Sequence, residues 1–407
     1  MIGTTIEWYD FFIFGTASAL VFNKLFFSSL DPVAGMLAAF STFAAGLFAR
    51  PLGALFFGHF GDRIGRKRML VLSLLLMGIP TTIIGLLPTY EQVGLSAVVA
   101  LVFLRICQGV ALGGEWGGAV LMAVEHAPKG RRGLFGSLPQ AGCPLALILS
   151  SAVFAWVSSL PGDAFLSWGW RLPFLASALL IVVGVFVRRR VGESPDFARV
   201  EQAGETVRVP VAEIGSRHLT TVLLGVGAKL GEITMFWLMA VFALSYATGT
   251  LGLPRGDILR WITVGAVVML VLMPLCGSLA DRVGRRALFA AGNVVLLICA
   301  VPLFMVIGGG DAILVGLSIA FSLGVLYPVM YAPEASLFSM LFPAKVRYTG
   351  LSLSANVGGA IGGGVAPLAA TWLLSATGSI AAVGAYLAVA AAVSLACTWA
   401  MRPVEEA

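Results

Sequence analysis

Two stretches of the chain, GHFGDRIGRK at residues 58–67 and GSLADRVGRR at residues 277–286, fit the single pattern G-x-x-x-D-R-x-G-R-[KR]. Each stretch follows the second long apolar run of its half of the chain. A further correspondence joins Pro128–Arg132 to Pro343–Arg347, two polar connectors that each precede another apolar run. Matches that recur at a nearly constant spacing are typical of an internal duplication. The sequence therefore predicts two similar halves in parallel repeat.

The composition places most of the chain in a membrane. Of the 407 residues, 59% are hydrophobic and only 11% are charged, whereas an ordinary soluble domain holds about 25% charged residues. A membrane-crossing helix needs about 20 apolar residues, so this length accommodates about twelve crossings with short connectors. The 49 glycines agree with this interpretation, because small residues let helices approach closely in lipid. A soluble globular protein is excluded.

Apolar runs between polar connectors predict six helices in each half. We expect an N-terminal six-helix bundle over residues 1–188, a charged cytoplasmic linker over 189–218 with room for a short surface helix, and a C-terminal six-helix bundle over 219–407. The predicted helices span residues 3–27, 34–60, 69–87, 96–125, 134–157 and 170–188 in the first half, and 219–248, 257–280, 287–307, 312–340, 351–375 and 380–401 in the second.

The distribution of charge predicts the orientation in the membrane. The formal net charge is +6, and most lysine and arginine residues fall in connectors of one side. Because positively charged loops stay in the cytoplasm, both termini are expected there, and the basicity does not indicate nucleic-acid binding. The first apolar segment begins without a basic flank, so an N-terminal extension is expected to be missing, and Glu7 and Asp10 argue against a cleavable signal peptide. The cysteines stand singly, so no disulfide framework or metal site is expected.

The duplicated pattern resembles the major facilitator superfamily over the whole chain. Within it, four stretches resemble the metabolite:H+ symporter family: IEWYDFFIFGTASAL at 6–20, ARPLGALFFGHFGDRIGRKRML at 49–70, RICQGVALGGEWGGA at 105–119 and FGSLPQAG at 135–142. The resemblance implies an all-α membrane protein with twelve transmembrane helices in two pseudo-symmetric six-helix bundles. It also implies transport of polar metabolites, mostly organic acids such as shikimate, 2-oxoglutarate and citrate, and also betaine and proline, in a bacterial-type inner membrane.

Ionisable residues inside the apolar segments are the candidate binding groups, because an unpaired ion in hydrocarbon is expensive. Arg50, Arg105 and Lys229 are the candidate anion ligands, since arginine contacts a carboxylate with two parallel hydrogen bonds. Arg105 and Gln108 share one helix face with Glu115. The remaining candidate substrate-binding residues are Gln108, Gln140, Asn356, Tyr9 and Trp116. The alternative is that the buried charges are internal ion pairs that hold helices together.

Carboxylates in the same segments are the candidate proton carriers, because a low-dielectric interior favours the uncharged form of an acid. Asp10 is the first candidate, and Glu115 and Glu232 follow. Two more carboxylates, Glu7 and Glu334, lie in apolar segments. No nucleotide or redox cofactor is implied, and the coupling ion is expected to be H+.

The two repeated loops are the candidate gates, in which an Asp followed by a tight Gly turn and Arg docks on a neighbouring helix, as the resemblance implies. The acid at Glu125 corresponds to Met340 in the second half, so the second gate is expected to latch less tightly, unless Glu334 substitutes. The gating residues are Gly58, Asp62, Arg63, Gly65, Arg66, Gly277, Asp281, Arg282, Gly284, Arg285, Glu125, Arg132 and Arg347.

We therefore expect a monomeric secondary active transporter that takes up a small carboxylated metabolite with H+ by alternating access. The alternatives are a symporter of zwitterions such as betaine or proline, and an uncoupled facilitator or exporter of the same fold. No G-x-S-x-G elbow, P-loop or metal-ligand spacing occurs, so an enzyme is not expected. The expected partners are a small polar metabolite, which we expect to be an organic anion, together with protons and membrane lipid.

Overall fold

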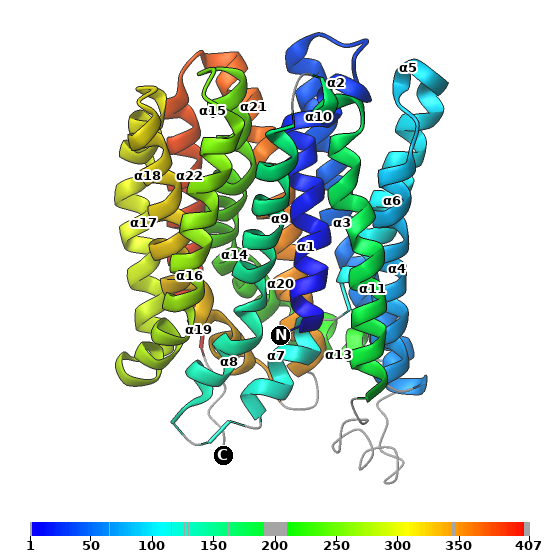
Figure 1. The fold of residues 1–407 in the computed structure, drawn as a ribbon. Helices are drawn as coiled ribbons and strands as arrows, with labels where there is room; N and C mark the ends of the chain where they lie inside the picture. The colour runs from blue at the N-terminus through cyan, green and yellow to red at the C-terminus, as the bar shows by residue number, and fades with distance from the viewer. Residues whose placement is uncertain are drawn as a thin grey trace.

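The computed structural model of the chain describes residues 2–64, 66–114, 116–125, 127–128, 130–160, 163–190, 210–343 and 347–402. In this part of the chain the secondary structure is helical, and ten helices are long and apolar enough to cross a membrane. A shorter apolar helix covers Val71–Leu86. Figure 1 shows the helices standing side by side, with the start of α1 and the end of α22 at the same end of the molecule. We call this end the termini face.

The first half follows the predicted order of segments. Its helices are α1 Ile2–Ala17, η1 Ser18–Phe22 and α2 Asn23–Leu25; α3 Pro32–Ile64; α4 Arg66–Leu86; α6 Leu95–Leu112 and α7 Trp116–Glu125; α8 Arg132–Gln140 and α9 Gly142–Ser158; and η2 Gly169–Arg171 and α11 Leu172–Arg190. The short helices α5 Tyr90–Val93 and α10 Ala164–Ser167 lie in connectors.

The second half repeats this arrangement. Its helices are α14 Leu219–Trp237, η3 Leu238–Phe242 and α15 Ala243–Gly249; α16 Arg255–Val283; α17 Arg285–Gly308; α18 Ala312–Phe321, η4 Ser322–Leu326 and α19 Tyr327–Ser339; α20 Arg347–Gly358, η5 Gly359–Gly364 and α21 Val365–Thr377; and α22 Ile380–Ala400. A short helix, α13 Pro210–Arg217, lies inside the predicted linker, of which residues 191–209 are outside the described part.

The prediction of one unbroken helix is wrong for the fourth and fifth segments. The fourth is interrupted after Leu112, where a Cβ at Gly113 would overlap the carbonyl oxygen of Arg50. The fifth is interrupted at Ala141, three residues before Pro144. Because proline has no N–H, the carbonyl of Gln140 loses its helical donor there. Both interruptions lie close to candidate site residues.

Glycine contacts bring α3 and α6 together backbone to backbone. A Cβ at Gly53 would overlap the carbonyl oxygen of Val110, and a Cβ at Gly109 would overlap that of Gly46. Small residues permit this approach in a membrane helix pair. The tight seam holds Arg50 on α3 and Arg105 on α6 at fixed positions in the first half.

In the described part of the chain, four π-helical turns widen the long segments, and two of them occupy closely corresponding positions. The turn η1 follows α1 in the first segment, and η3 follows α14 in the seventh. The other two, η4 and η5, lie in the tenth and eleventh segments. Such turns break the regular hydrogen-bond ladder and are frequent at functional sites.

Candidate functional site

Arg50 and Asn356 join the two halves of the chain at the candidate binding site. The Arg50 guanidinium donates through Nε to Oδ1 of Asn356 at 3.0 Å, and both side chains are buried. Nδ2 of Asn356 donates in turn to the carbonyl oxygens of Gly113 at 3.1 Å and Ser352 at 2.8 Å. Within the described residues, Arg50 has no carboxylate at ion-pair distance. Its charge is therefore balanced by no acidic neighbour in that part of the chain.

Arg105 is enclosed inside the first half. Its side chain is 0% exposed, and its guanidinium carbon lies 3.8 Å from the ring centroid of Phe11 and 4.1 Å from that of Phe14. Nη1 donates to Oε1 of Gln108 at 3.0 Å, and Gln108 donates to Oγ1 of Thr81 at 2.6 Å. The aromatic faces stabilise the cation. Arg105 and Gln108, predicted from their shared face, are thus brought together.

Asp10 and Tyr9 face the helix α11 of the same half. Ser177 donates to Oδ1 of Asp10 at 2.6 Å, whereas Oδ2 has no hydrogen-bond partner. The hydroxyl of Tyr9 donates to the carbonyl oxygen of Pro173 at 3.0 Å. The hydroxyl of Tyr9, predicted to bind substrate, is therefore occupied by the protein backbone.

In the second half, Lys229, Glu232 and Glu334 form a buried cluster that we call the charged triad. Nζ of Lys229 donates to Oε1 of Glu232 at 2.5 Å and to both carboxylate oxygens of Glu334, at 2.7 and 2.8 Å. Lys229 and Glu232 lie one helical turn apart on α14, and Glu334 comes from α19. Oε2 of Glu232 is buried without a partner. Lys229, predicted as an anion ligand, is thus surrounded by two carboxylates of its own half.

Two further predicted residues line the junction near the triad. Gln140 on α8 donates through Nε2 to the carbonyl oxygen of Tyr331 on α19 at 2.9 Å. The ring of Trp116 lies 5.8 Å from Nζ of Lys229, and the ring of Tyr331 lies 5.3 Å from it. Gln140 and Trp116 therefore reach the second half from the first. The predicted proton carrier Glu115 is outside the described residues.

The second repeated loop closes the two halves together at the termini face. The carboxylate of Asp281 accepts from the backbone N–H groups of Gly133 at 2.7 Å and Leu134 at 3.0 Å. These amides belong to the first turn of α8, where unpaired N–H groups attract an anion. Gly284, with φ of 96°, supplies the turn between α16 and α17.

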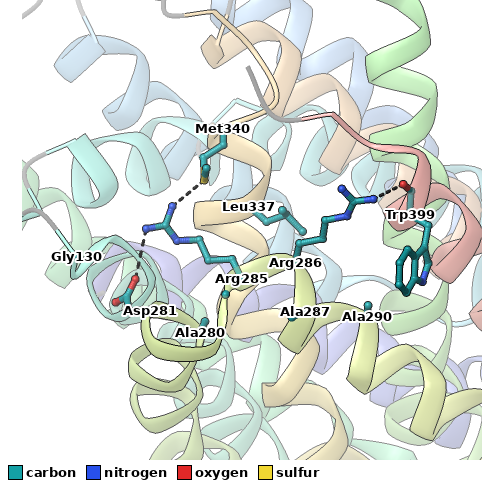
Figure 2. Close-up of a pocket in the computed structure, with 11 residues that line it drawn as sticks. Gly130, Ala280, Asp281, Arg285, Arg286, Ala287, Ala290, Leu337, Met340 and Trp399 are labelled. Atoms are coloured by element: carbon teal, nitrogen blue, oxygen red, sulfur yellow. Dashed lines mark hydrogen bonds and ion pairs between the residues drawn. The ribbon is translucent and has the colours of Figure 1, made fainter. Parts of the chain in front are cut away.

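Arg285 links this loop to Met340, as Figure 2 shows. It donates to Oδ1 of Asp281 at 3.4 Å and to the sulfur of Met340 at 2.7 Å, and both partners line a pocket at the termini face. A thioether is a weak acceptor, so this contact is weaker than a pair with a carboxylate. The hypothesis that Glu334 substitutes for the missing acid is wrong, because Glu334 is bonded to Lys229 in the charged triad.

The structure describes the side chains of some of the remaining predicted gating residues and not of others. Arg282 is exposed, and Arg347 donates through Nε to the carbonyl oxygen of Phe342 at 3.2 Å. Gly277 packs against Gly133, and Arg132 begins α8. The side chains of the first repeated loop and its acidic partner lie outside the described residues: Gly58, Asp62, Arg63, Gly65, Arg66 and Glu125.

Sequence reasoning missed two polar residues and the partner of a third. Ser177 and Thr81 hold Asp10 and Gln108, but isolated hydroxyls in apolar segments give no distinctive signal. Glu334 was recognisable as a carboxylate in an apolar segment. Its partner could not be deduced, because Lys229 lies 105 positions away in the sequence.

Comparison with known proteins identifies the family. The model of the sugar (and other) transporter family matches residues 1–210 and 214–404. The chain belongs to this transporter family. Among its relatives, the inner membrane metabolite transport protein YhjE of Escherichia coli K12 is 41% identical, over 92% of this chain and 86% of the relative. The shikimate transporter of the same organism is 38% identical over the same shares, and its proline/betaine transporter is 31% identical over 92% and 76%.

Solved transporter structures share the fold. The partially occluded inward-open xylose transporter XylE from E. coli has a TM-score of 0.76 and 18% identity, covering 99% of this chain and 96% of that chain. The major facilitator superfamily proton:xylose symporter XylE bound to 6-bromo-6-deoxy-D-glucose has a TM-score of 0.75 and 17% identity, covering 98% and 95%. At this identity the likeness concerns the fold alone. The predicted major facilitator fold is confirmed, as are the predictions of an integral membrane transporter and against an enzyme.

Proposed function

We propose that this transporter takes up a small carboxylated metabolite together with H+ by alternating access. The contact that supports this proposal is the one between Arg50 and Asn356. It joins the two halves, and alternating access requires a cargo site between them. The Arg50 guanidinium is buried and has no acidic partner among the described residues, which is costly, and a bound carboxylate would offset that cost with paired hydrogen bonds.

The name of one relative agrees with an acidic cargo, and the name of one structural neighbour agrees with coupling to H+. The relative is named a shikimate transporter, and the neighbour is named a proton:xylose symporter. Shikimate is a carboxylic acid, so the name supports an anion ligand at Arg50. Asp10 and Glu232 are the candidate proton carriers among the described residues, and both are 0% exposed.

A zwitterionic cargo is the second candidate. The charged triad holds two carboxylates against one ammonium, so it favours a positive group nearby. A zwitterion would present its carboxylate to Arg50 and its ammonium to the triad. Two relatives named as proline/betaine transporters support this alternative.

The placement in the membrane is part of the same proposal. We take the termini face to be cytoplasmic, in a bacterial-type inner membrane, as the basic connectors predict. Residues 1–188 and 219–407 would then move as two bundles about the Arg50–Asn356 contact, joined by the linker 189–218, in a monomer.

Uptake into proteoliposomes tests the function directly. The purified protein is supplied with radiolabelled shikimate, 2-oxoglutarate, citrate, proline and betaine, with and without an inward proton gradient. We expect one class of carboxylate to accumulate only with the gradient. Gradient-independent equilibration would instead indicate a facilitator, preference for betaine or proline would indicate the zwitterion alternative, and net efflux alone would indicate an exporter.

A further inference from the structure

We propose that Glu232 and Glu334 share one exchangeable proton beside Lys229, and that this proton accompanies the cargo. The inference rests on the proposed function, because it names the proton site of the same transporter. It assigns a role to Glu334, for which the sequence suggested only a substitute place in the second gate. It also replaces a single carboxylate with a pair drawn from two helices, α14 and α19.

The geometry of the triad supports a shared proton. One ammonium group contacts both carboxylates, at 2.5 Å on one side and at 2.7 and 2.8 Å on the other. Both carboxylates therefore lie around the same nitrogen atom. Among the described residues, Oε2 of Glu232 is buried without a hydrogen-bond partner. A proton can therefore be added at this oxygen, in a site that already holds the second carboxylate.

The charge of the triad leads to the same conclusion. With both carboxylates ionised, the triad carries one net negative charge in a site where all three side chains are buried. An uncompensated buried charge is costly, and two carboxylates that share a site repel each other. One proton brings the net charge to zero. Because the pair titrates as a unit, the proton belongs to both residues and not to either alone.

The triad lies next to the proposed cargo site. Two consecutive glycines lie between Lys229 and Arg50. A Cβ at Gly358 would lie 2.7 Å from Cβ of Lys229, and a Cβ at Gly359 would lie 3.7 Å from Nη1 of Arg50. An anion bound at Arg50 would therefore be repelled by the negative triad and tolerated by the protonated one. By linkage, the anion must then strengthen proton binding by the same factor.

In the described part of the chain, three other titratable groups that are neutral in their ordinary forms face the triad. Cys143 comes from α9, and Tyr327 and Tyr331 come from α19. A thiol and two phenols are neutral in their ordinary forms at neutral pH. Among the described residues, the ionisation of the triad is therefore decided by Lys229, Glu232 and Glu334 themselves, with Arg50 as the neighbouring cation.

Asp10, the first candidate from the sequence, has a different setting. It is a single carboxylate that accepts from Ser177 inside the first half, and its neighbouring cation is Arg105. No described contact connects it to the Arg50–Asn356 pair. A proton on Asp10 would consequently act on the cargo through Arg105, and Asp10→Asn is the matched control variant.

Infrared difference spectroscopy tests the proton site without any substrate. The purified wild-type protein is moved from about pH 9 to about pH 5, and the carbonyl band of a protonated carboxylic acid is recorded for a titrating pair. We expect one such band, lost in both Glu232→Gln and Glu334→Gln and retained in Asp10→Asn. If one glutamate variant does not fold, the other alone tests the proposal, because the loss of either carboxylate removes the shared proton.

Transport measurements test whether this proton is coupled to the cargo. A unit of pH difference can drive about tenfold accumulation for each proton. In Glu334→Gln we expect accumulation to fall to about onefold while exchange of cargo stays within about threefold of wild type, since the amide mimics the neutral triad. Glu334→Asp, which keeps a protonatable group, should restore accumulation. A purely structural role for Glu334 would reduce exchange and accumulation together.

Two results would overturn the inference. One is a carboxylic acid band that persists in both glutamate variants and disappears in Asp10→Asn. The other is undiminished accumulation by Glu334→Gln. Failure of the proposed function gives a different pattern: wild-type vesicles would show no gradient-driven uptake, while the titrating band still depended on Glu232 and Glu334.

Discussion

In the first half of the chain, Arg50, Arg105 and Asp10 each bond to neutral partners, whereas in the second half Lys229 bonds directly to two carboxylates. The first arrangement leaves charges that an incoming ion can engage. The second arrangement compensates its cation internally and leaves a surplus carboxylate. If the proposed function holds, the duplicated halves have separated two tasks, with anion binding in the first half and proton binding in the second.

The largest expected effect comes from removing the cation of the triad. Lys229→Met leaves two buried carboxylates without their partner, so we expect a loss of about 3–5 kcal/mol in stability, as for a broken buried ion pair. Thermal unfolding in detergent measures it. Adding Glu334→Gln to Lys229→Met should recover part of the loss. Equal melting temperatures for Lys229→Met and wild type would contradict the difference between the halves.

The next effect concerns the anion ligand. In Arg50→Ala we expect about a hundredfold weaker binding of the carboxylate cargo, because two charge-assisted hydrogen bonds are lost. Scintillation proximity binding measures the affinity. The sequence predicts that Arg105→Ala abolishes binding of the cargo while the protein stays folded. A loss restricted to Arg50→Ala would mean that Arg105, enclosed by Phe11 and Phe14, serves Asp10 and not the cargo.

A smaller effect is expected at the gate. Asp281→Asn weakens the contact with the backbone amides of Gly133 and Leu134, so we expect the transport rate to fall about tenfold with the equilibrium affinity unchanged. Asp62→Asn tests the corresponding loop and is expected to reduce the rate more. Rate and affinity are compared in the same vesicles. Equal losses in the two variants would remove the expected asymmetry between the gates.

The smallest effect sharpens that asymmetry. Met340→Glu supplies Arg285 with the acid that the second half lacks, and a charge-assisted pair is stronger than a contact with a thioether. We expect the closed gate to be stabilised and the transport rate to fall about twofold to fivefold. Arg285→Gln in the same background serves as the control. An unchanged rate would show that the contact with Met340 does not limit opening.

The sequence predicted the segments well because hydrophobic length and the repeated loops are local signals. The predicted helix 257–280 corresponds to Arg255–Val283, and 312–340 to 312–339. The breaks at Gly113 and Ala141 were missed, since they depend on a close approach between helices and on a lost backbone donor. Periodicity alone does not contain either kind of information.

The site could be predicted only as a set of residue types. Buried charges were recognisable, and Arg105 with Gln108 share a helix face, so their hydrogen bond followed from spacing. The pairing of Lys229 with Glu334, and of Arg50 with Asn356, depends on helices that are distant in sequence. Several partners were equally plausible from the sequence, and only the three-dimensional arrangement selects among them.

The bond from Asp281 to α8 has a consequence for how this protein tolerates variation. Its acceptor is a side chain, but both donors are main-chain amides, so nearly any residue at 134 preserves the gate. Proline is the exception there, since it has no amide hydrogen. Gly133 is less permissive, because a Cβ would lie 2.5 Å from the Gly277 carbonyl oxygen and 2.8 Å from Oδ1 of Asp281. The residue at position 134 can therefore vary during evolution, whereas the rest of the contact requires two glycines, Gly133 and Gly277, and Asp281.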